Sequence, residues 1–367
     1  MKVLHFVTGG FSGATQVAVD LCLAAQRSGS MQVVLVLRRK RNTDSVRVQA
    51  LIDQGLDVRI VPGWSHLATI FALYKLCRHF SPDVLVAHGF SEHLWGRYAG
   101  LLAKVPHLVH VEHNSRERYN WWRLWQAKWL SQHTAAIVGV SEGVRDALVQ
   151  RGFPAERCIA IPNGIELSRF EAADQTPWDR RSASIIMASR FARQKDQGTL
   201  VKAIELLRHD GLKPHLAFAG LGKSRLIKKI QRQVEAAKLQ SQIQFLGQVQ
   251  GLHKILMQHQ IFVLSTHYEG MPLALVEAMA AGCACIATDV VGVRGVIEDG
   301  ITGLLVAEND PQDLANAIGK LLRQPELARS LGDAARQKAI QHLGLAKMQA
   351  SYEKMLSSLM LNSSLAE

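Results

Sequence analysis

The chain has 367 residues, of which 48% are hydrophobic and 20% charged, a composition that excludes wholesale disorder and is typical of two globular domains. The net charge of +12 suggests an anionic partner, which leaves nucleic acid, a phosphorylated ligand and an acidic membrane surface open. No apolar run approaches the ~20 residues that cross a bilayer, the five scattered cysteines predict no disulfide framework, and no signal peptide is recognisable, so we expect a cytoplasmic protein.

The first half of the chain alternates short apolar stretches with helical patterns. Strands are predicted at 2–7, 31–37, 57–61, 83–87, 107–112 and 136–140. Nearly continuous apolar strands separated by helices are typical of a parallel sheet covered on both faces. We therefore expect a first domain at 1–165, followed by a linker at 166–183 whose edges carry turn residues.

The pattern restarts in the second half. Strands are predicted at 184–189, 215–220, 243–246, 261–264, 284–288 and 303–306. They define a second domain at 184–345, and a final helix at 346–367 is expected to pack back on the first domain. The predicted fold class is α/β, with two doubly wound Rossmann-like domains that face each other across a ligand-binding cleft.

The loop after the first predicted strand is rich in glycine. Gly10 and Gly13 would let backbone N–H groups approach an anion at the start of the next helix. The spacing is not Gly-x-Gly-x-x-Gly, and Arg38 ends the second strand where an NAD site needs a carboxylate. A plain tight turn remains the alternative.

The most informative stretch is 265–282, which follows an apolar strand. Glu269 lies in the loop, Pro272 suits the first position of a helix, and Glu277 falls in the second turn of an otherwise apolar helix. A carboxylate on a buried helix is costly unless something hydrogen-bonds to it. A pair of ligand hydroxyls would serve, although a local ion pair is the simpler reading of Glu277 alone.

These residues resemble a known signature. Ser-x-x-x-Glu-Gly-x-Pro-Leu-x-Leu-x-Glu-Ala-Met-Ala-x-Gly, which includes Glu269 and Glu277, is similar to that of retaining glycosyltransferases of family 4 (glycosyltransferases group 1), which have the GT-B fold. The segments 161–166, 188–196 and 218–222 resemble further family segments in the same order. The chain departs from the pattern at Gly295, where the family usually has an acidic residue.

The resemblance implies a role for individual residues. The catalytic set would be His113, Glu269, Arg190 and Lys195, with His113 close to the transferred sugar. Gly10 and His88 would lie on the acceptor side. The implied donor-binding residues are Gly13, Arg190, Lys195, Gly247, Glu269, Gly270, Met271, Pro272, Leu273 and Glu277, of which Glu277 would bind the ribose.

The implied chemistry needs positive charge at the leaving group. Negative charge grows on the departing diphosphate, and preorganised cations there lower the barrier. The sequence has no Asp-x-Asp and no His, Cys or Asp cluster with metal-ligand spacing. We therefore expect no metal and no cofactor, with Arg190 and Lys195 on the diphosphate. The resemblance implies a UDP-sugar, since uracil is the family's usual base, with guanine as the alternative.

A separate feature is the segment 116–130, which holds four of the seven tryptophans beside several Lys and Arg residues. Trp121, Trp125 and Trp129 recur every four residues and would line one stripe of a helix. Aromatic and basic residues together fit a helix at an anionic membrane interface. Burial of the stripe in the first domain's core is an equal alternative.

The resemblance thus implies a glycosyltransferase that uses a nucleotide sugar and a saccharide or lipid-linked acceptor, in the synthesis of cell-envelope polysaccharide or lipopolysaccharide. Peripheral binding to the inner face of the cytoplasmic membrane is the related expectation. Two alternatives remain: a sugar-nucleotide 2-epimerase on the same fold, and a nucleic-acid-binding protein, for which no helix-turn-helix, zinc or RNP-like motif is found.

Overall fold

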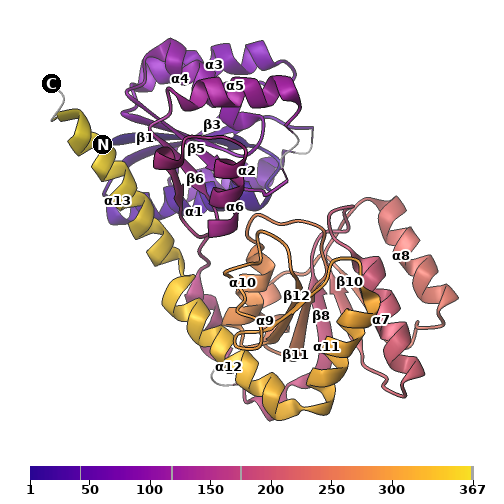
Figure 1. Ribbon diagram of the computed structural model, residues 1–367. Helices are drawn as coiled ribbons and strands as arrows, with labels where there is room; N and C mark the ends of the chain where they lie inside the picture. The colour runs from indigo at the N-terminus through magenta and orange to yellow at the C-terminus, as the bar shows by residue number, and fades with distance from the viewer. Residues whose placement is uncertain (42, 117–118, 174–175, 365–367) are drawn as a thin grey trace. The chain divides into compact units, whose positions relative to one another are not determined.

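The computed structural model describes residues 1–41, 43–116, 119–173 and 176–364. Parts of three predicted segments, at 117–118, 174–175 and 365–367, lie outside the described residues. The chain divides into two compact units, one made of Met1–Gly164 with Leu345–Glu367 and the other of Ile165–Gly344 (Figure 1). Each unit is built on one parallel sheet, which confirms the predicted class of two Rossmann-like α/β units.

The first sheet has the order β3-β2-β1-β4-β5-β6-β7. Because β1 pairs with both β2 and β4, the strand order reverses between β1 and β4. The bounds are β1 (Lys2–Thr8), β2 (Gln32–Arg38), β3 (Val58–Val61), β4 (Val84–His88), β5 (His107–Glu112), β6 (Ala136–Gly139) and β7 (Cys158–Ala160). The edge strand β7 was not predicted, since three residues carry too little periodicity to show.

Helices cover both faces of the first sheet. Figure 1 shows α3, α4 and α5 on one side and α1 on the other. Side chains of Ser65 and Asn120 cap α3 and α5 by accepting backbone N–H groups. The bounds are α1 (Gly13–Ser28), α2 (Ser45–Asp53), α3 (His66–Phe80), α4 (Glu92–Ala103), α5 (Trp121–Ser131), α6 (Glu142–Gln150) and η1 (Ala155–Arg157).

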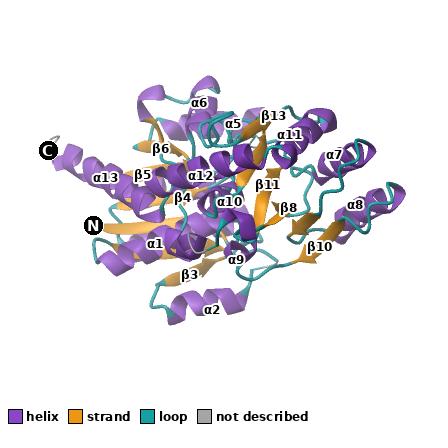
Figure 2. Ribbon diagram, turned by 90° about the horizontal axis from the view of Figure 1, so that it is seen from below, coloured by secondary structure: helices purple, strands orange, loops and turns teal. Residues whose placement is uncertain are grey.

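The C-terminal helix α13 (Leu345–Ser364) belongs to the first unit. It lies along α1, as Figures 1 and 2 both show. The hydroxyl of Ser30 donates to Glu353 Oε1 at 2.9 Å, and the backbone N–H of Gly164 points to the sulfur of Met348 at 3.2 Å. The last helix therefore completes the unit that the first residues begin.

The second sheet has the order β10-β9-β8-β11-β12-β13, with the reversal between β8 and β11. Figure 2 shows its strands flanked by helices. The strands are β8 (Ser182–Ala188), β9 (Leu216–Ala219), β10 (Ile243–Gly247), β11 (His259–Leu264), β12 (Ala284–Thr288) and β13 (Leu304–Val306). The helices are α7 (Gln197–His209), α8 (Ser224–Ala236), α9 (Leu252–Leu256), α10 (Leu273–Ala280), α11 (Pro311–Arg323) and α12 (Pro325–His342).

In the segment expected as a linker, 166–183, the described residues form the 3₁₀ turns η2 (Leu167–Ala173) and η3 (Trp178–Arg180), and the last two residues begin β8. Phe170 and Trp178 are buried, and Trp178 joins the core of the second unit. These residues therefore belong to the second unit, because two large aromatic side chains anchor them there.

The described residues include no helix with the length and hydropathy needed to span a membrane.

Candidate functional site

The second unit gathers most of the predicted site residues where its strand order reverses. Ligands of open α/β sheets bind at this point, beyond the carboxyl ends of the strands. The loop after β8 carries Arg190 and Lys195, and the loop after β11 carries Glu269. Because β8 pairs directly with β11, the two loops emerge side by side from the same edge of the sheet. We call this the donor half-site.

Lys195 and Glu269 join the two loops of the donor half-site. The Lys195 Nζ atom forms an ion pair with Glu269 Oε1, and both side chains are largely buried. The hydroxyl of Thr266 donates to the same carboxylate oxygen at 2.8 Å. Lys195 also forms a backbone bridge with Thr266, and Gln194 Nε2 donates to the Tyr268 carbonyl at 2.6 Å. The relative position of the ammonium and the carboxylate is therefore fixed by several bonds.

Arg190 lies on the same loop but remains exposed. Its backbone is held by the buried side chain of Gln197, whose amide donates to the Arg190 carbonyl and the Ser189 hydroxyl, each at 3.1 Å. Asp196 then caps α7 by accepting the Thr199 N–H. A fixed backbone with an exposed guanidinium suits recognition of an anion, because guanidinium groups bind phosphates through paired N–H donors.

Glycines let neighbouring loops approach the loop after β8. A Cβ atom on Gly220 would lie 2.1 Å from the Ser189 carbonyl oxygen, and one on Gly222 would lie 2.3 Å from that of Phe191. The Gly220 N–H donates to the Gly247 carbonyl at 2.7 Å. Gly247 itself has a positive φ of 65° and open space where a side chain would be. Its backbone is therefore accessible to a ligand at the end of β10.

Gly292 is a site residue whose packing role the sequence did not reveal. A Cβ atom at this position would lie 2.4 Å from the carbonyl oxygens of both Glu269 and Gly270. The loop after β12 thus packs directly on the backbone of the predicted sugar-binding residues. The motif Gly-Val-Arg-Gly drew attention to Gly295, whose would-be Cβ meets open space, but only the structure shows that Gly292 makes the contact.

Helix α10 begins at the same edge of the second sheet. Gly270, Met271 and Pro272 are buried, Leu273 opens the helix, and Glu277 is half-buried one turn later. The first N–H groups of an α-helix point out of its N-terminus, which carries partial positive charge. The N-terminus of α10 therefore adds positive potential near Glu269 and Lys195.

A cavity of about 430 Å³ in the second unit lies away from these residues. It is lined by residues such as Ser184, His215 and Gln242, at the amino ends of β8, β9 and β10. In a parallel sheet the amino and carboxyl ends lie at opposite edges. The cavity is therefore separate from the donor half-site.

In the first unit, three histidines form a hydrogen-bonded row that ends at the predicted catalytic His113. His5 Nδ1 lies 3.0 Å from His88 Nε2, and His88 Nδ1 lies 3.2 Å from His113 Nε2. Burial lowers the pKa of His5 to about 4 and that of His113 to about 3. His88 was expected on the acceptor side, but it is fully buried with both ring nitrogens engaged by histidines, so it has no nitrogen left for an acceptor.

The glycine-rich loop after β1 lies beside this row. The Gly9 N–H donates to the Arg38 carbonyl at 2.8 Å, and Thr15 Oγ1 donates to the Thr8 carbonyl at 2.9 Å. Gly13 starts α1 and has open space at its Cβ position, and Gly10 has only Thr8 Oγ1 at 3.7 Å. Packing therefore does not require glycine at Gly10 or Gly13, and their backbones are open to a ligand.

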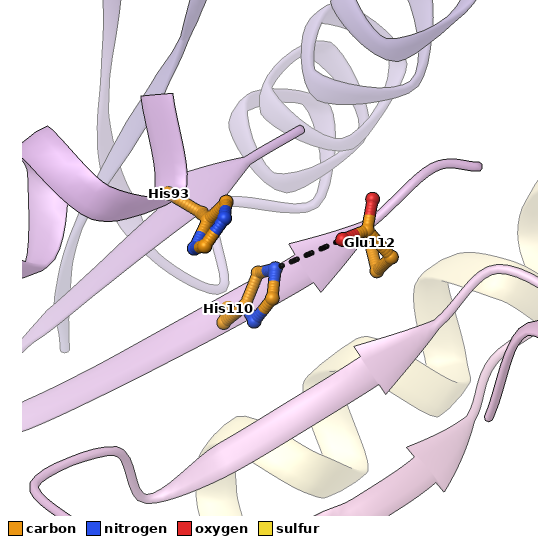
Figure 3. Close-up of side chains that lie close together, drawn as sticks. All are labelled: His93, His110 and Glu112. Atoms are coloured by element: carbon orange, nitrogen blue, oxygen red, sulfur yellow. Dashed lines mark ion pairs between the residues drawn. The ribbon is translucent and has the colours of Figure 1, made fainter. Parts of the chain in front are cut away.

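A second buried cluster, made of His93, His110 and Glu112, lies next to the row (Figure 3). Arg97 donates from Nη2 to His93 Nδ1 at 2.7 Å. Because a guanidinium can only donate, the proton of neutral His93 is on Nε2, which lies 3.1 Å from the Tyr119 hydroxyl. Tyr119 donates in turn to Glu112 Oε2 at 3.2 Å, and Glu112 Oε1 accepts the His113 N–H at 3.1 Å.

This cluster has residue types that bind metals, but its geometry does not suit one. The rings of His93 and His110 are stacked, with centroids 4.0 Å apart and planes 16° apart, whereas the lone pairs of metal-binding imidazoles converge on one point. Both His93 nitrogens are already engaged, one of them by a cation. The cluster is therefore a hydrogen-bonded network that leads to the backbone of His113.

The tryptophan-rich segment is exposed rather than buried. Trp121, Trp125 and Trp129 on α5 are 80%, 54% and 40% exposed, while Ala127 and Leu130 fill the core side of the helix. Trp129 stacks on Tyr98 of α4, with ring centroids 6.2 Å apart, and the stacking continues through Trp95 to His66 of α3. We call the exposed stripe of Trp121, Trp125 and Trp129 on α5 the aromatic surface. The alternative that the stripe fills the first domain's core is wrong.

Residues 168–338 match the family described as Glycosyl transferases group 1, and residues 11–169 match Glycosyltransferase Family 4. The chain is 25% identical over 272 residues to UDP-Gal:alpha-D-GlcNAc-diphosphoundecaprenol alpha-1,3-galactosyltransferase of Escherichia coli, with 69% of each chain covered. It is 27% identical over 296 residues to alpha-maltose-1-phosphate synthase of Mycolicibacterium smegmatis, covering 72% of this chain and 76% of the relative. Anabaena HepE in complex with UDP and glucose superposes with a TM-score of 0.85 at 18% identity, covering 98% of this chain and 100% of HepE.

The two family matches together extend over both units, and the likeness to HepE shows that the fold is GT-B. The chain belongs to the group 1 glycosyltransferases of family 4, as its signature around Glu269 and Glu277 predicted. It is accordingly a glycosyltransferase.

Proposed function

We propose that this enzyme transfers a sugar from a UDP-sugar, with retention and without a metal, to a lipid-linked or saccharide acceptor in cell-envelope polysaccharide or lipopolysaccharide synthesis. The observation that carries the donor half of the proposal is the Lys195–Glu269 ion pair at the strand-order reversal of the second sheet. The names of the relatives are consistent with it, since the Escherichia coli enzyme is a UDP-Gal-dependent transferase and HepE was crystallised with UDP and glucose.

The donor would lie over the carboxyl edge of the second sheet. Arg190 and Lys195 would neutralise the diphosphate, aided by the N-terminus of α10. Glu277 would accept the ribose hydroxyls, and the accessible backbone of Gly247 would flank the base. Glu269, fixed by Lys195 and Thr266, would hold the sugar together with the backbone of Gly270, Met271 and Leu273.

In the transfer step, the bond from the sugar C1 to the diphosphate oxygen breaks and the bond from C1 to the acceptor oxygen forms on the same face. The acceptor proton leaves with the diphosphate. Cations held at the leaving oxygen stabilise the charge that grows there. His113, partly buried at the carboxyl end of β5, is the first-unit residue proposed to contact the sugar.

The acceptor side of the proposal rests on a positively charged corner of the first unit. Arg38 and Lys40 both pair with the single carboxylate of Glu92, at 3.3 and 3.1 Å. Arg123 lies near the same group of charges. The pKa of His66 is lowered first by burial and then by the positive charges of Arg38 and Arg123. Because Arg38 is buried and bonded to Glu92, Lys40 and Arg123, which are partly exposed, are the cations that would meet a phosphate-bearing acceptor, such as a lipid diphosphate.

The aromatic surface would bring the first unit to a membrane that contains such an acceptor. Its exposed tryptophans are interleaved with Arg123 and Lys128, and aromatic rings with basic neighbours are typical of helices at anionic bilayer interfaces. Flotation with vesicles of phosphatidylglycerol and phosphatidylcholine tests this. Trp125→Ala/Trp129→Ala should stay in the soluble fraction, whereas Ile301→Ala/Ile340→Ala, exposed apolar residues elsewhere, should float like wild type. Equal flotation of both double variants would contradict the docking.

The donor proposal is tested by thermal shift against a panel of nucleotide sugars, because a ligand that binds the folded state raises the melting temperature. UDP-sugars should give the largest shifts, and chelation by EDTA should leave shift and turnover unchanged. Incubation of a labelled donor without acceptor separates transfer from epimerisation. Conversion of the donor sugar to its 2-epimer under those conditions would overturn the proposal in favour of an epimerase.

A further inference from the structure

The hydrogen bonds in the row of His5, His88 and His113 couple the protonation of the three rings to one another. His5 is on β1, His88 ends β4, and His113 follows β5, so the row crosses three neighbouring strands of the first sheet. The rings are stacked in sequence, with centroids 5.3 and 5.4 Å apart. Both of the hydrogen bonds run from a Nδ1 atom to the Nε2 atom of the next histidine.

All three rings are neutral at neutral pH. Burial lowers the pKa of His5 to about 4 and of His113 to about 3, and burial with the nearby His5 and His113 lowers that of His88 well below 6.5. A neutral imidazole carries a single N–H and a single acceptor nitrogen. If His88 donates from Nδ1 to His113, its Nε2 must accept from His5, and the reverse holds equally.

Only two arrangements of protons therefore satisfy both bonds. In one, every ring carries its proton on Nδ1, and in the other every ring carries it on Nε2. His113 Nε2 is engaged by His88 in both, so its Nδ1 is the atom left to meet a ligand. That atom is a donor in the first arrangement and an acceptor in the second. The protons on His5 and His88 therefore determine whether His113 Nδ1 donates or accepts a hydrogen bond.

We propose that His88 and His5 are positioning residues that hold the His113 ring in one orientation and couple its tautomer to their own, so that the ring is set for the sugar that it contacts. Glu112 supports the same residue from another direction, because its Oε1 accepts the His113 backbone N–H. A ring held by its side chain and its main chain meets the substrate without reorganisation, which is the condition for efficient positioning. The contact of His113 with the sugar rests on the proposed function, whereas the tautomer coupling does not.

Histidine nitrogen NMR on the full chain tests the coupling directly, since protonated and bare ring nitrogens have distinct ¹⁵N shifts. In wild type, His5, His88 and His113 should all show the same tautomer. His88→Phe fills the space without hydrogen bonds and should leave His113 as a mixture of tautomers. His88→Asn places an amide near the position of the lost Nδ1 and should keep His113 in place. His79→Asn, at an exposed histidine of α3, is the control.

Kinetics of sugar transfer test the consequence. His88→Phe should lower kcat roughly tenfold with the donor KM changed less than twofold, and His88→Asn should recover most of that loss. Different tautomers in the wild-type row, or a single His113 tautomer in His88→Phe, would overturn the coupling. Equal kcat in the two His88 variants would overturn the positioning role. Wild-type protein without transfer activity would count against the proposed function alone, because the NMR result stands without it.

Discussion

The ammonium of Lys195 and the carboxylate of Glu269 form an ion pair between two loops that are 74 residues apart in sequence. The pair lies where the strand order of the second sheet reverses, between β8 and β11. Since both side chains are largely buried, removing either one leaves the other as an unpaired charge that water cannot solvate well. A substitution in the pair should therefore lower both the stability of the protein and its transfer activity.

We expect Lys195→Met and Glu269→Gln each to destabilise the protein by about 3 kcal/mol, because breaking a buried pair leaves its partner uncompensated. The double variant should lose less than the sum of the two single losses. Urea unfolding measures both quantities, and transfer assays should show kcat/KM lowered by roughly 100-fold in each single variant.

Lys202→Met is the matched control, since Lys202 is an exposed lysine on the helix that follows this loop. It should leave stability within about 0.5 kcal/mol of wild type. Strictly additive losses in the double variant would show that the two groups do not interact in solution.

The edge of the sheet that carries Arg190, Lys195 and Glu269 could be predicted from the sequence, because strands and helices alternate regularly and site residues of such folds follow strands. The close packing of Gly292 could not, because it depends on a contact with a backbone more than twenty residues away. The role of His5 could not be predicted either, because in the sequence it is one residue within an apolar strand and nothing there indicates a hydrogen bond to His88. The first-unit networks join side chains from separate strands and helices, and no local spacing encodes such contacts.

Gly292→Ala should reduce donor binding. The added methyl would meet the carbonyl oxygens of Glu269 and Gly270 at 2.4 Å, and both belong to backbone that cannot rotate away. We expect loss of about 2 kcal/mol in stability and a higher donor KM. Gly295→Ala is the comparison, because a Cβ there meets open space although its φ is positive. A Gly292→Ala enzyme with wild-type KM would show that the loop moves freely.

Glu277→Ala tests the ribose assignment. If the carboxylate accepts the ribose hydroxyls, the variant should lose most of the thermal shift caused by UDP, and a 2′-deoxy or 3′-deoxy analogue should give wild-type protein a similarly small shift. Glu205→Ala, on a neighbouring helix of the same unit, should retain the full shift. A Glu277→Ala protein that still distinguishes UDP from its deoxy analogues would place the ribose elsewhere.

Tyr119→Phe should weaken the network behind His113. The variant removes the hydroxyl that joins His93 Nε2 to Glu112 Oε2 while keeping the ring that packs edge-on against Phe90. We expect a loss of about 1–3 kcal/mol, the usual effect of removing one partner from buried polar groups. Tyr74→Phe, on the outer helix α3, should change stability by less than about 0.5 kcal/mol. Equal unfolding midpoints for the two variants would contradict the network.

The buried histidines predict that stability falls as the solution becomes acidic. Burial lowers the pKa of His5 from 6.5 to about 4 in the folded state, so between these values the unfolded chain binds the proton and the folded chain does not. Stability therefore rises with pH across this window and is lost as pH falls through it. From pH 7.5 to pH 5, His5 alone should contribute a loss of about 2 kcal/mol.

His110 gives a direct test, because its ring is fully buried, its Nε2 atom lies 3.6 Å from Glu112 Oε2, beyond hydrogen-bond distance, and burial lowers its pKa well below 6.5. His110→Phe should reduce the difference in unfolding free energy between pH 7.5 and pH 5, whatever it does to stability at either value. The exposed His79→Asn should leave that difference unchanged. If His110→Phe and wild type lost equal stability on acidification, His110 would have to titrate normally in the folded protein, and its burial next to His93 could not hold in solution.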